Sequence, residues 1–506
     1  MLLDKLYEFA VATPDKPAIV YNNRPVSYAD FWRLVQGCRE SLKPHAPGHG
    51  LALVSIDNLL EGWIVELALR SLGLDTAAVP EPQHAALFAD MPVTCVVTLD
   101  SDPRLQIPAP VGAARLTLSH PSAQAQALDR TAPLPAPPPG PFGGHYLLTS
   151  GTTGTPKPIL SHAGASAEGI AALRGLAARF TDPYAAQGPD TVICLFDLGL
   201  WTAMGYLRPI FSWVDGATVV LDQRGDHHLA LEWPLITHIH ATPHYLAKVM
   251  SAPEGAFAYR PDACVIMSAG ALTAALARET RRRLTPTIVL NVGSTEVGLW
   301  ARSVVKDDDD LLWHTIAPDR IVQVVDEADA PLPVGRLGQV RVGLERQGAA
   351  SHLGDAADTA RVYDQGWFYP GDLGVLDDQG RISLRGRASD VISIAGVKYP
   401  TEPWERRLQD RLECDGVCVL AGRFGGDVEQ LHIFIETRAQ IPFDRVVDAI
   451  RGTLAGFPEA QVHKIDALPR TPLGKIRRVE LAQRIQNGEF SPAGPGRAGT
   501  ATAPPR

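Results

Sequence analysis

Apolar segments alternate with amphipathic stretches between residues 50 and 300 of the chain. This alternation is typical of repeated β-α units, which form mostly parallel sheets covered by helices. The segments that we expect to form strands are residues 51–56, 95–99, 191–196, 217–221 and 287–290. The pattern therefore predicts an α/β fold for the first and larger part of the chain.

Three further segments break this pattern. Residues 131–144 are rich in proline and form a connection inside the large domain. The longest apolar run, residues 191–207, contains Asp197 and is too short and too polar for a membrane span, so we expect a buried strand and helix there. Residues 486–506 lack apolar anchors at their end and are expected to form a disordered tail.

Composition and charge narrow the class of protein. A chain of 506 residues is expected to fold as at least two domains, and its 45% hydrophobic content is enough for large cores. The net charge of −9 argues against a nucleic-acid partner or an anionic membrane. No secretory leader is recognisable, so we expect six reduced cysteines in a cytoplasmic protein. Cys414 and Cys418 lack a second pair nearby, which disfavours a zinc site.

A candidate anion-binding loop follows a short apolar strand and ends in a lysine. Its residues are Thr149, Ser150, Gly151, Thr152, Thr153, Gly154, Thr155, Pro156 and Lys157. Glycines let backbone N–H groups turn toward a phosphate, hydroxyls add donors and the lysine adds positive charge. The spacing fits neither a Walker loop nor a dinucleotide fingerprint. Because glycine, serine and threonine are also common turn residues, an ordinary surface turn is the alternative.

The loop resembles the phosphate motif Thr-Ser-Gly-Thr-Thr-Gly-x-Pro-Lys of the adenylate-forming ligases, which include acyl-CoA synthetases, nonribosomal peptide adenylation domains and beetle luciferase. Four more segments match the motifs of this superfamily in its order: residues 293–296, 369–372, 386–387 and 469–475. The resemblance covers residues 1 to about 485. It implies a large N-terminal domain over residues 1–388 and a small, mobile α+β lid domain over residues 389–485, before the tail at 486–506.

The resemblance also implies roles for individual residues. The loop would hold the phosphates of ATP together with Gly293, Ser294 and Thr295, and Glu296 would bind Mg²⁺. Asp372 and Arg387 would reach the ribose or the phosphates, and Lys475 would act catalytically by neutralising charge on the carboxylate and the α-phosphate. Without the motifs, Asp372 would be read as a turn residue and Lys475 as a solvated lysine beside Arg477 and Arg478.

The second half-reaction would take place after the lid rotates about a hinge. Ser389 occupies the hinge position, where relatives usually have aspartate or lysine. Gly396 and Lys398 would line the tunnel for the incoming thiol. Val292 stands where relatives commonly place an aromatic residue that stacks on adenine.

The substrate pocket contains a segment similar to the Phe-Asp-x-x-x-Trp segment of amino-acid-activating relatives. Here Asp197 would pair with a substrate ammonium, because a carboxylate in an apolar run is costly without a partner. An aspartate that caps a helix is an equally good reading. The other residues that the resemblance places in the pocket are Leu198, Trp201, His244, Met267, Ala269, Asn291, Leu299 and Trp300. Met267 and Trp300 are equally compatible with the core.

A metal site at His238, His240 and His244 is disfavoured, because no acidic or thiol partner stands beside them in the sequence. We predict an enzyme that uses ATP and Mg²⁺ to adenylate a small carboxylic acid, with release of pyrophosphate. It would then pass the acyl group to a phosphopantetheine thiol. An amino-acid-like substrate and a separate carrier protein are favoured, and an acyl- or aryl-CoA synthetase that uses free coenzyme A is the alternative. A non-catalytic nucleotide-binding homologue is a third reading.

Overall fold

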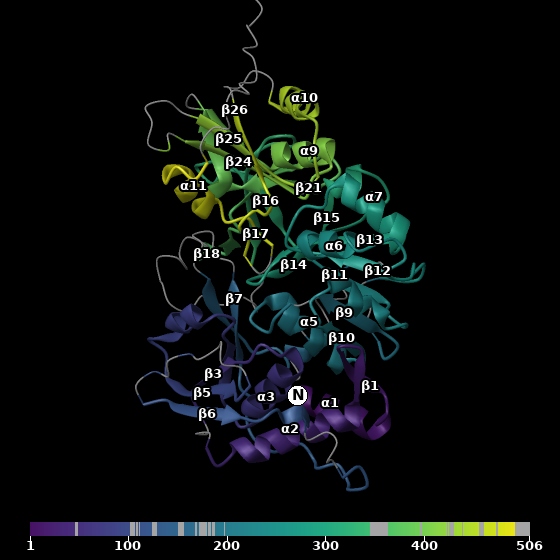
Figure 1. The fold of residues 1–506 in the computed structure, drawn as a ribbon. Helices are drawn as coiled ribbons and strands as arrows, with labels where there is room; N and C mark the ends of the chain where they lie inside the picture. The colour runs from purple at the N-terminus through teal and green to yellow at the C-terminus, as the bar shows by residue number, and fades with distance from the viewer. Residues whose placement is uncertain are drawn as a thin grey trace, which may run out of the picture.

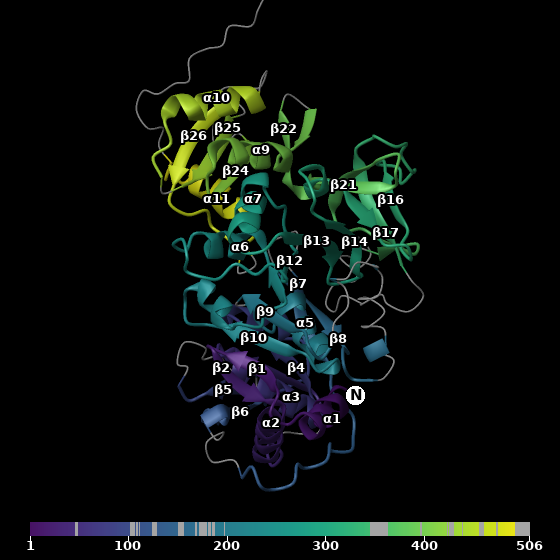
Figure 2. The ribbon, with the colours of Figure 1, turned by 90° about the vertical axis from the view of Figure 1, so that its right-hand side faces the viewer.

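The computed structural model describes residues 1–45, 49–101, 107, 110, 112–123, 129–149, 156–166, 169–171, 180, 184, 188–196, 198–344, 363–394, 397–422, 424, 430–437, 439–454, 460–471 and 474–490. Figures 1 and 2 show the N-terminal elements at one end of the molecule and the C-terminal elements at the other. We refer to residues 389–490 as the C-terminal part and to residues 1–388 as the N-terminal part.

A six-stranded sheet forms one half of the N-terminal part, with strand order β6-β5-β3-β4-β7-β8. Its strands are β3 (Leu51–Ser55), β4 (Asp75–Ala78), β5 (Val93–Leu99), β6 (Ala114–Leu118), β7 (His145–Thr149) and β8 (Lys157–Ser161). All neighbours are parallel except β7 and β8, which are antiparallel. Two helical segments accompany this sheet, α3 (Leu59–Ser71) and the 3₁₀ turn η1 (Pro82–Phe88).

A larger sheet of fifteen described strands forms the other half. Its parallel strands are β1 (Pro17–Tyr21), β9 (Val192–Phe196), β10 (Thr218–Asp222), β11 (His238–Ala241), β12 (Cys264–Met267) and β13 (Thr287–Ser294). Its antiparallel strands are β2 (Arg24–Ser27), β14 (Gly298–Val304), β15 (His314–Ile316), β16 (Val322–Val325), β17 (Gly338–Gly343), β18 (Tyr363–Asp364), β19 (Trp367–Phe368), β20 (Asp372–Leu376) and β21 (Arg381–Arg387).

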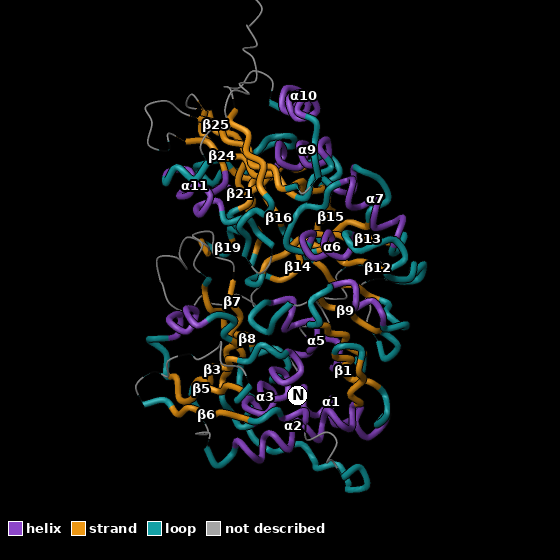
Figure 3. The backbone as a smooth tube through the Cα atoms, viewed as in Figure 1, coloured by secondary structure: helices purple, strands orange, loops and turns teal. Residues whose placement is uncertain are grey.

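Helices accompany the parallel strands (Figure 3). They are α1 (Leu2–Ala12), α2 (Tyr28–Leu42), α5 (Ala203–Val214), α6 (Pro243–Met250) and α7 (Ala274–Arg283), with 3₁₀ turns η4 (His227–Glu232) and η5 (Asp309–Leu311). Four of these helices begin at a serine or threonine whose hydroxyl accepts a hydrogen bond from a backbone N–H of the first turn. These caps are Ser27, Thr202, Thr242 and Thr273.

A polar network lies inside the core at the start of β7. All residues of α3 are buried, including Glu66 and Arg70. Glu66 accepts a hydrogen bond from the Tyr206 hydroxyl at 3.0 Å, and Arg70 donates to the same hydroxyl. His145 stacks on the Tyr206 ring and pairs with the Leu200 carbonyl oxygen at 2.9 Å. The network therefore fixes the start of β7 against the segment that follows β9.

The C-terminal part has its own hydrophobic core (Figure 1). Its elements are the 3₁₀ turn η6 (Ala388–Asp390), β22 (Val391–Ile394), β23 (Val397–Pro400), α9 (Glu402–Leu412), β24 (Gly416–Gly422), β25 (Gln430–Glu436), α10 (Phe443–Thr453), β26 (Ala460–Ile465) and α11 (Arg478–Gln486). Strands β24 to β26 form a mixed sheet, with β22 and β23 as a separate hairpin.

The predicted fold class is confirmed. Strands β3, β5, β9, β10 and β13 overlap the five predicted strand segments to within a residue at most ends, and β9 and α5 lie in the long apolar run. The sequence pattern ended the last strand at Leu290, whereas β13 continues to Ser294 because its final residues pair with β14. Within the described ranges, no helix has the length and apolar character needed to cross a membrane.

Candidate active site

The two ends of the candidate phosphate loop lie opposite each other. Thr149 is the last residue of β7 and is buried, and it pairs across the hairpin with Lys157, the first residue of β8. The intervening Ser150, Gly151, Thr152, Thr153 and Gly154 lie outside the described residues. The antiparallel pairing closes the loop at its base, so the segment leaves and re-enters the sheet at one point.

A second predicted motif forms the tight connection between β13 and β14. Gly293 pairs with Leu299 and Ser294 with Gly298. The Ser294 hydroxyl accepts a hydrogen bond from the Val297 N–H at 3.3 Å. A Cβ atom on Gly293 would lie 2.7 Å from the Gly298 carbonyl oxygen, so this position excludes any side chain. The turn that carries Thr295 and Glu296 is thereby held close to the adjoining ends of β13 and β14.

Asp372 and Arg387 form an ion pair at the end of the β20–β21 hairpin. The two residues are cross-strand partners, and the Arg387 Nε atom lies 2.9 Å from Asp372 Oδ1. Arg387 also donates to the Pro370 carbonyl oxygen. Burial raises the pKa of Asp372, while Arg387 and Lys475 oppose that rise. The carboxylate is therefore surrounded by cations while it is largely removed from water.

Lys475 reaches this cluster from the C-terminal part. Burial, followed by the Arg387 charge, lowers its pKa to about 8, against the opposing effect of the carboxylates of Asp372, Glu296 and Asp390. Because Coulomb interactions weaken with distance, these groups lie near one another. The predicted catalytic lysine, magnesium ligand and ribose ligand thus converge at one site, although they are separated by up to 179 residues (475 − 296) in the chain.

The C-terminal part packs against the N-terminal part beside this cluster. Gly474 adopts a φ of +83°, and a Cβ atom at this position would lie only 2.5 Å from the Cβ atom of His244 in α6. Burial, followed by Lys248, Arg470 and His227, lowers the pKa of His244 to about 4. A second contact joins α9 to α7, where the Ala275 N–H donates to Asp410 Oδ1 at 3.3 Å.

An ion-pair network that the sequence did not suggest holds the C-terminal part together. Arg478 donates from two nitrogens to the two carboxylate oxygens of Glu405, each at 2.7 Å, and its Nε atom lies 3.1 Å from Asp390 Oδ2. In the sequence analysis Arg478 appeared only with Arg477 in the basic run beside Lys475, which was the alternative reading of that lysine. Of these two arginines, only Arg477 is exposed, with Glu480 at 3.8 Å. Sequence separations of 73 and 88 residues carry no periodic signal that would have revealed this network.

Of the predicted substrate-pocket residues, two lie near or just beyond the end of a strand, and most of the others pack in hydrophobic clusters. Asn291 lies near the end of β13 and its Oδ1 atom accepts a hydrogen bond from Arg302 Nε at 2.9 Å. Ala269 follows β12 with a φ of +64°. Leu198, Met267 and Trp300 are buried members of hydrophobic clusters, and Trp201 packs against two of these clusters. Leu299 is partly buried in β14. Asp197 lies outside the described residues.

The predicted hinge residue Ser389 and the predicted tunnel residue Lys398 lie at the surface. Ser389 is exposed and donates to Asp390 Oδ1 at 3.0 Å. Lys398 is 75% exposed and pairs with Glu327 of the N-terminal part at 3.2 Å. Gly396 is outside the described residues. In this arrangement Lys475, rather than Lys398, faces the Asp372 cluster. Val292 packs against the core formed around Trp300 and Phe368.

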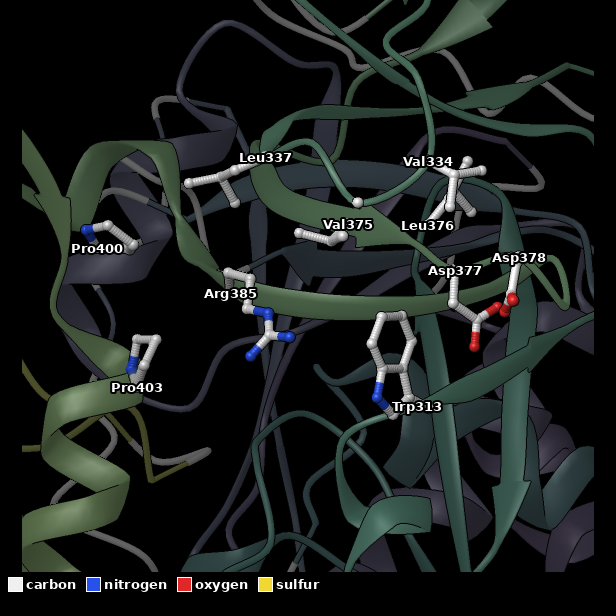
Figure 4. Close-up of a pocket in the computed structure, with 11 residues that line it drawn as sticks. Trp313, Val334, Leu337, Val375, Leu376, Asp377, Asp378, Arg385, Pro400 and Pro403 are labelled. Atoms are coloured by element: carbon white, nitrogen blue, oxygen red, sulfur yellow. The ribbon is translucent and has the colours of Figure 1, made fainter.

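A surface cavity of about 590 Å³ lies elsewhere between the two parts of the chain. Figure 4 shows Trp313 and Arg385 on one side and Pro400 and Pro403 of the C-terminal part on the other. None of the predicted site residues lines it. Among the described residues, no group of three histidine, cysteine, aspartate or glutamate side chains is arranged to hold a metal ion.

Comparisons with known proteins agree with this geometry. The chain is 28% identical to indoleacetate–CoA ligase of Aromatoleum aromaticum, over 94% of this chain and 96% of that protein. It is 23% identical to surfactin synthase subunit 3 of Bacillus subtilis, over 94% of this chain but 38% of that protein. ATP-bound MatB from Rhodopseudomonas palustris has the same fold, with a TM-score of 0.76 at 20% identity over 97% of this chain and 99% of that one.

The profile of the AMP-binding enzyme family matches residues 6–345, which include the phosphate loop and the β13–β14 turn. This match covers more than half of the chain, and the full-length relatives include acyl-CoA ligases. The chain therefore belongs to the AMP-binding enzyme family and is an ATP-dependent, AMP-forming ligase.

Proposed function

We propose that this enzyme adenylates a small carboxylic acid and then transfers the acyl group to the thiol of a phosphopantetheine arm. The observation that carries the proposal is the convergence of Lys475 with Asp372, Glu296 and Arg387 across the boundary between the two parts of the chain. A carboxylate and a triphosphate repel each other, so the site needs a cation placed where negative charge increases. Lys475 meets that need with a flexible ammonium group.

In the adenylation step, a carboxylate oxygen of the acid attacks the α-phosphorus of ATP. An acyl-phosphate bond forms, the bond between the α- and β-phosphates breaks, and pyrophosphate leaves. Lys475 would neutralise charge on the carboxylate and the α-phosphate, and Asp372 would accept hydrogen bonds from the ribose hydroxyls. The loop between Thr149 and Lys157 would hold the outgoing phosphates.

The carboxylate of Glu296 supplies the kind of hard oxygen ligand that Mg²⁺ prefers, and its charge acts on Lys475 in the same cluster. When bound, Mg²⁺ would reduce the negative charge of the phosphates. Glu296 would hold the ion from a turn whose position is fixed by the close approach of Gly293 to Gly298.

In the second step, a thiol attacks the carbonyl carbon of the acyl-adenylate, a thioester forms and AMP leaves. We propose that the C-terminal part rotates about Ser389 for this step, which would remove Lys475 and bring Gly396 and Lys398 to the site. The surface position of Lys398 in the present arrangement supports the idea that the two lysines serve different steps.

Two acceptors have support. The similarity of residues 196–201 to amino-acid-activating relatives favours an amino-acid-like substrate bound through Asp197, and with it a separate carrier protein. Free coenzyme A is favoured by the match to indoleacetate–CoA ligase along almost the whole of both chains. Thioester formation measured with coenzyme A and with carrier proteins that bear a free phosphopantetheine thiol would decide between them.

The decisive test of the reaction is Lys475→Ala, assayed in both half-reactions. We expect loss of substrate-dependent pyrophosphate exchange into ATP, with thioester formation from a supplied acyl-adenylate retained. Asp197→Ala, assayed with matched acids that carry or lack an amine, should impair the amino acids selectively. Near-normal pyrophosphate exchange by the Lys475 variant would overturn the assigned role of this lysine.

A further inference from the structure

A buried imidazole with no hydrogen-bond partner stands in the middle of the large sheet. His240 in β11 is 0% exposed, and neither of its ring nitrogens has a partner among the described residues. A neutral imidazole has one donor and one acceptor, and leaving both unsatisfied in the interior is costly. The ring therefore calls for a polar group that the described residues do not supply.

The strand register places His240 on the same face as the substrate-pocket residue Asn291. His240 is opposite Ile266, Ile266 is opposite Val289, and Asn291 follows two residues after Val289. Residues in register across a sheet share a face, as do alternate residues along one strand. His240 and Asn291 therefore lie on one face of the sheet. Asn291 lies in the second half of β13, toward the carboxyl end of the strand, and open α/β sheets bind their ligands at the carboxyl ends of their strands.

Asn291 adds a second buried group with hydrogen-bonding capacity to spare. Its Oδ1 atom accepts from Arg302, which fixes the amide orientation, and its buried Nδ2 atom has no partner in the described structure. An amide nitrogen only donates. The missing partner at this point is consequently a hydrogen-bond acceptor.

Two guanidinium groups lie beside these polar groups. Arg302 in β14 is the cross-strand partner of Asn291. Burial, followed by the charges of Arg208 in α5, of His238 and of Arg302, lowers the pKa of His240 well below the usual value. Burial, followed by repulsion from Arg302, lowers the pKa of Arg208 to about 10, so this side chain stays charged at neutral pH. No hydrogen bond or ion pair involving the Arg208 guanidinium is found in the described part of the chain. Among the residues that the structure describes, the charged and titratable groups that act on His240 are Arg208, His238 and Arg302, none of which is acidic.

We propose that this enzyme selects an acid that carries a second carboxylate, and that Arg208, His240 and Asn291 bind that group while the first carboxylate is adenylated. A partly buried guanidinium is stabilised by an accompanying anion, and a substrate carboxylate can accept hydrogen bonds from Arg208, from Asn291 Nδ2 and from the one protonated ring nitrogen of His240. The proposal rests on the proposed function, because it names the substrate class of the same ligase. It also predicts that an amine on the substrate is secondary to the second carboxylate.

Four acids with the same carbon chain test the proposal: butanoate, 2-aminobutanoate, succinate and aspartate. They combine presence or absence of an amine with presence or absence of a second carboxylate. We expect kcat/KM for pyrophosphate exchange to be at least about tenfold higher for each dicarboxylate than for its partner, since a hydrogen bond to a charged group is worth roughly 1.5–3 kcal/mol, or about 10- to 150-fold. Malonate and glutarate extend the test to shorter and longer chains.

Variants separate the binding role of Arg208 from a structural one. Arg208→Met should abolish the preference for dicarboxylates, and Arg208→Lys should keep part of it because the charge remains. Arg282→Met is the matched control, since Arg282 is 55% exposed and pairs with Glu254 and Glu279 away from this face. This variant should keep the full preference.

The outcomes distinguish an error in the assigned substrate class from an error in the assigned ligase activity. Exchange that is equal or better with the monocarboxylates, or a dicarboxylate preference that survives in Arg208→Met, would overturn the inference and leave the ligase activity standing. Absence of exchange with every acid, including aromatic acids added to the panel, would overturn the proposed function and the inference together.

Discussion

Gly474→Ala should separate the two half-reactions. Gly474 has a φ of +83°, and an added Cβ would lie 2.5 Å from Cβ and 3.0 Å from Cγ of His244. A left-handed conformation costs a non-glycine residue roughly 1–2 kcal/mol. The contact itself cannot be relieved by a side-chain rotation, because both Cβ atoms are attached directly to backbone. Carbon atoms prefer separations of about 3.5–4.0 Å, so the two backbones must move apart by about 1 Å.

A displacement of this size would move Lys475, the next residue, away from the Asp372 cluster. A misplacement of about 1 Å can reduce a rate roughly 100-fold, which corresponds to about 2.7 kcal/mol in the activation free energy. We therefore expect pyrophosphate exchange to fall by about two orders of magnitude. Thioester formation from a supplied acyl-adenylate should change little, because the proposed second step does not use the contact between Gly474 and His244.

The chain offers a matched control in Gly488→Ala. Gly488 has a similar φ of +75°, but a Cβ there would meet no atom within 4 Å. This variant carries the backbone strain without the collision and should keep normal pyrophosphate exchange. Replacing His244 by glycine in the Gly474→Ala background should restore part of the lost rate. Parent-like pyrophosphate exchange by Gly474→Ala, an equal loss in both half-reactions, or an equal loss of exchange in Gly488→Ala would each refute the role of this contact.

Two other predictions follow from the charges. Because burial lowers the pKa of Lys475 to about 8 and adenylation needs the ammonium form, kcat/KM for pyrophosphate exchange should be retained below pH 8 and decline as the pH rises through 8. Lys475→Arg, which stays charged, should lose this alkaline decline. A pH profile of the variant that matches the parent would contradict the assignment. Arg478→Met should destabilise the C-terminal part by about 3–5 kcal/mol, because it leaves buried Glu405 without its cationic partner. Arg477→Met should cost less than about 1 kcal/mol, because its ion pair is exposed. Hydrogen exchange in β24 and β25 would measure both effects, and equal effects would refute the network.

The sequence alone determined the fold class, the predicted strands and the family. These features are encoded locally: an apolar strand is visible in its composition, and a phosphate loop is visible in consecutive glycines and hydroxyls, as in the segment from Thr149 to Lys157. The family motifs also singled out Lys475, Asp372 and Glu296 as candidates, because the surrounding residues match as well.

Only the tertiary structure decided which of these groups meet and what else surrounds them. Lys475 reaches Asp372 and Glu296 because the C-terminal part packs against α6 through Gly474, and no sequence pattern encodes that contact. The partners of Arg478 and the unsatisfied nitrogens of His240 are likewise invisible in sequence spacing. Burial and the meeting of distant charges depend on how separate elements pack, whereas periodicity and turn chemistry report only on neighbours along the chain.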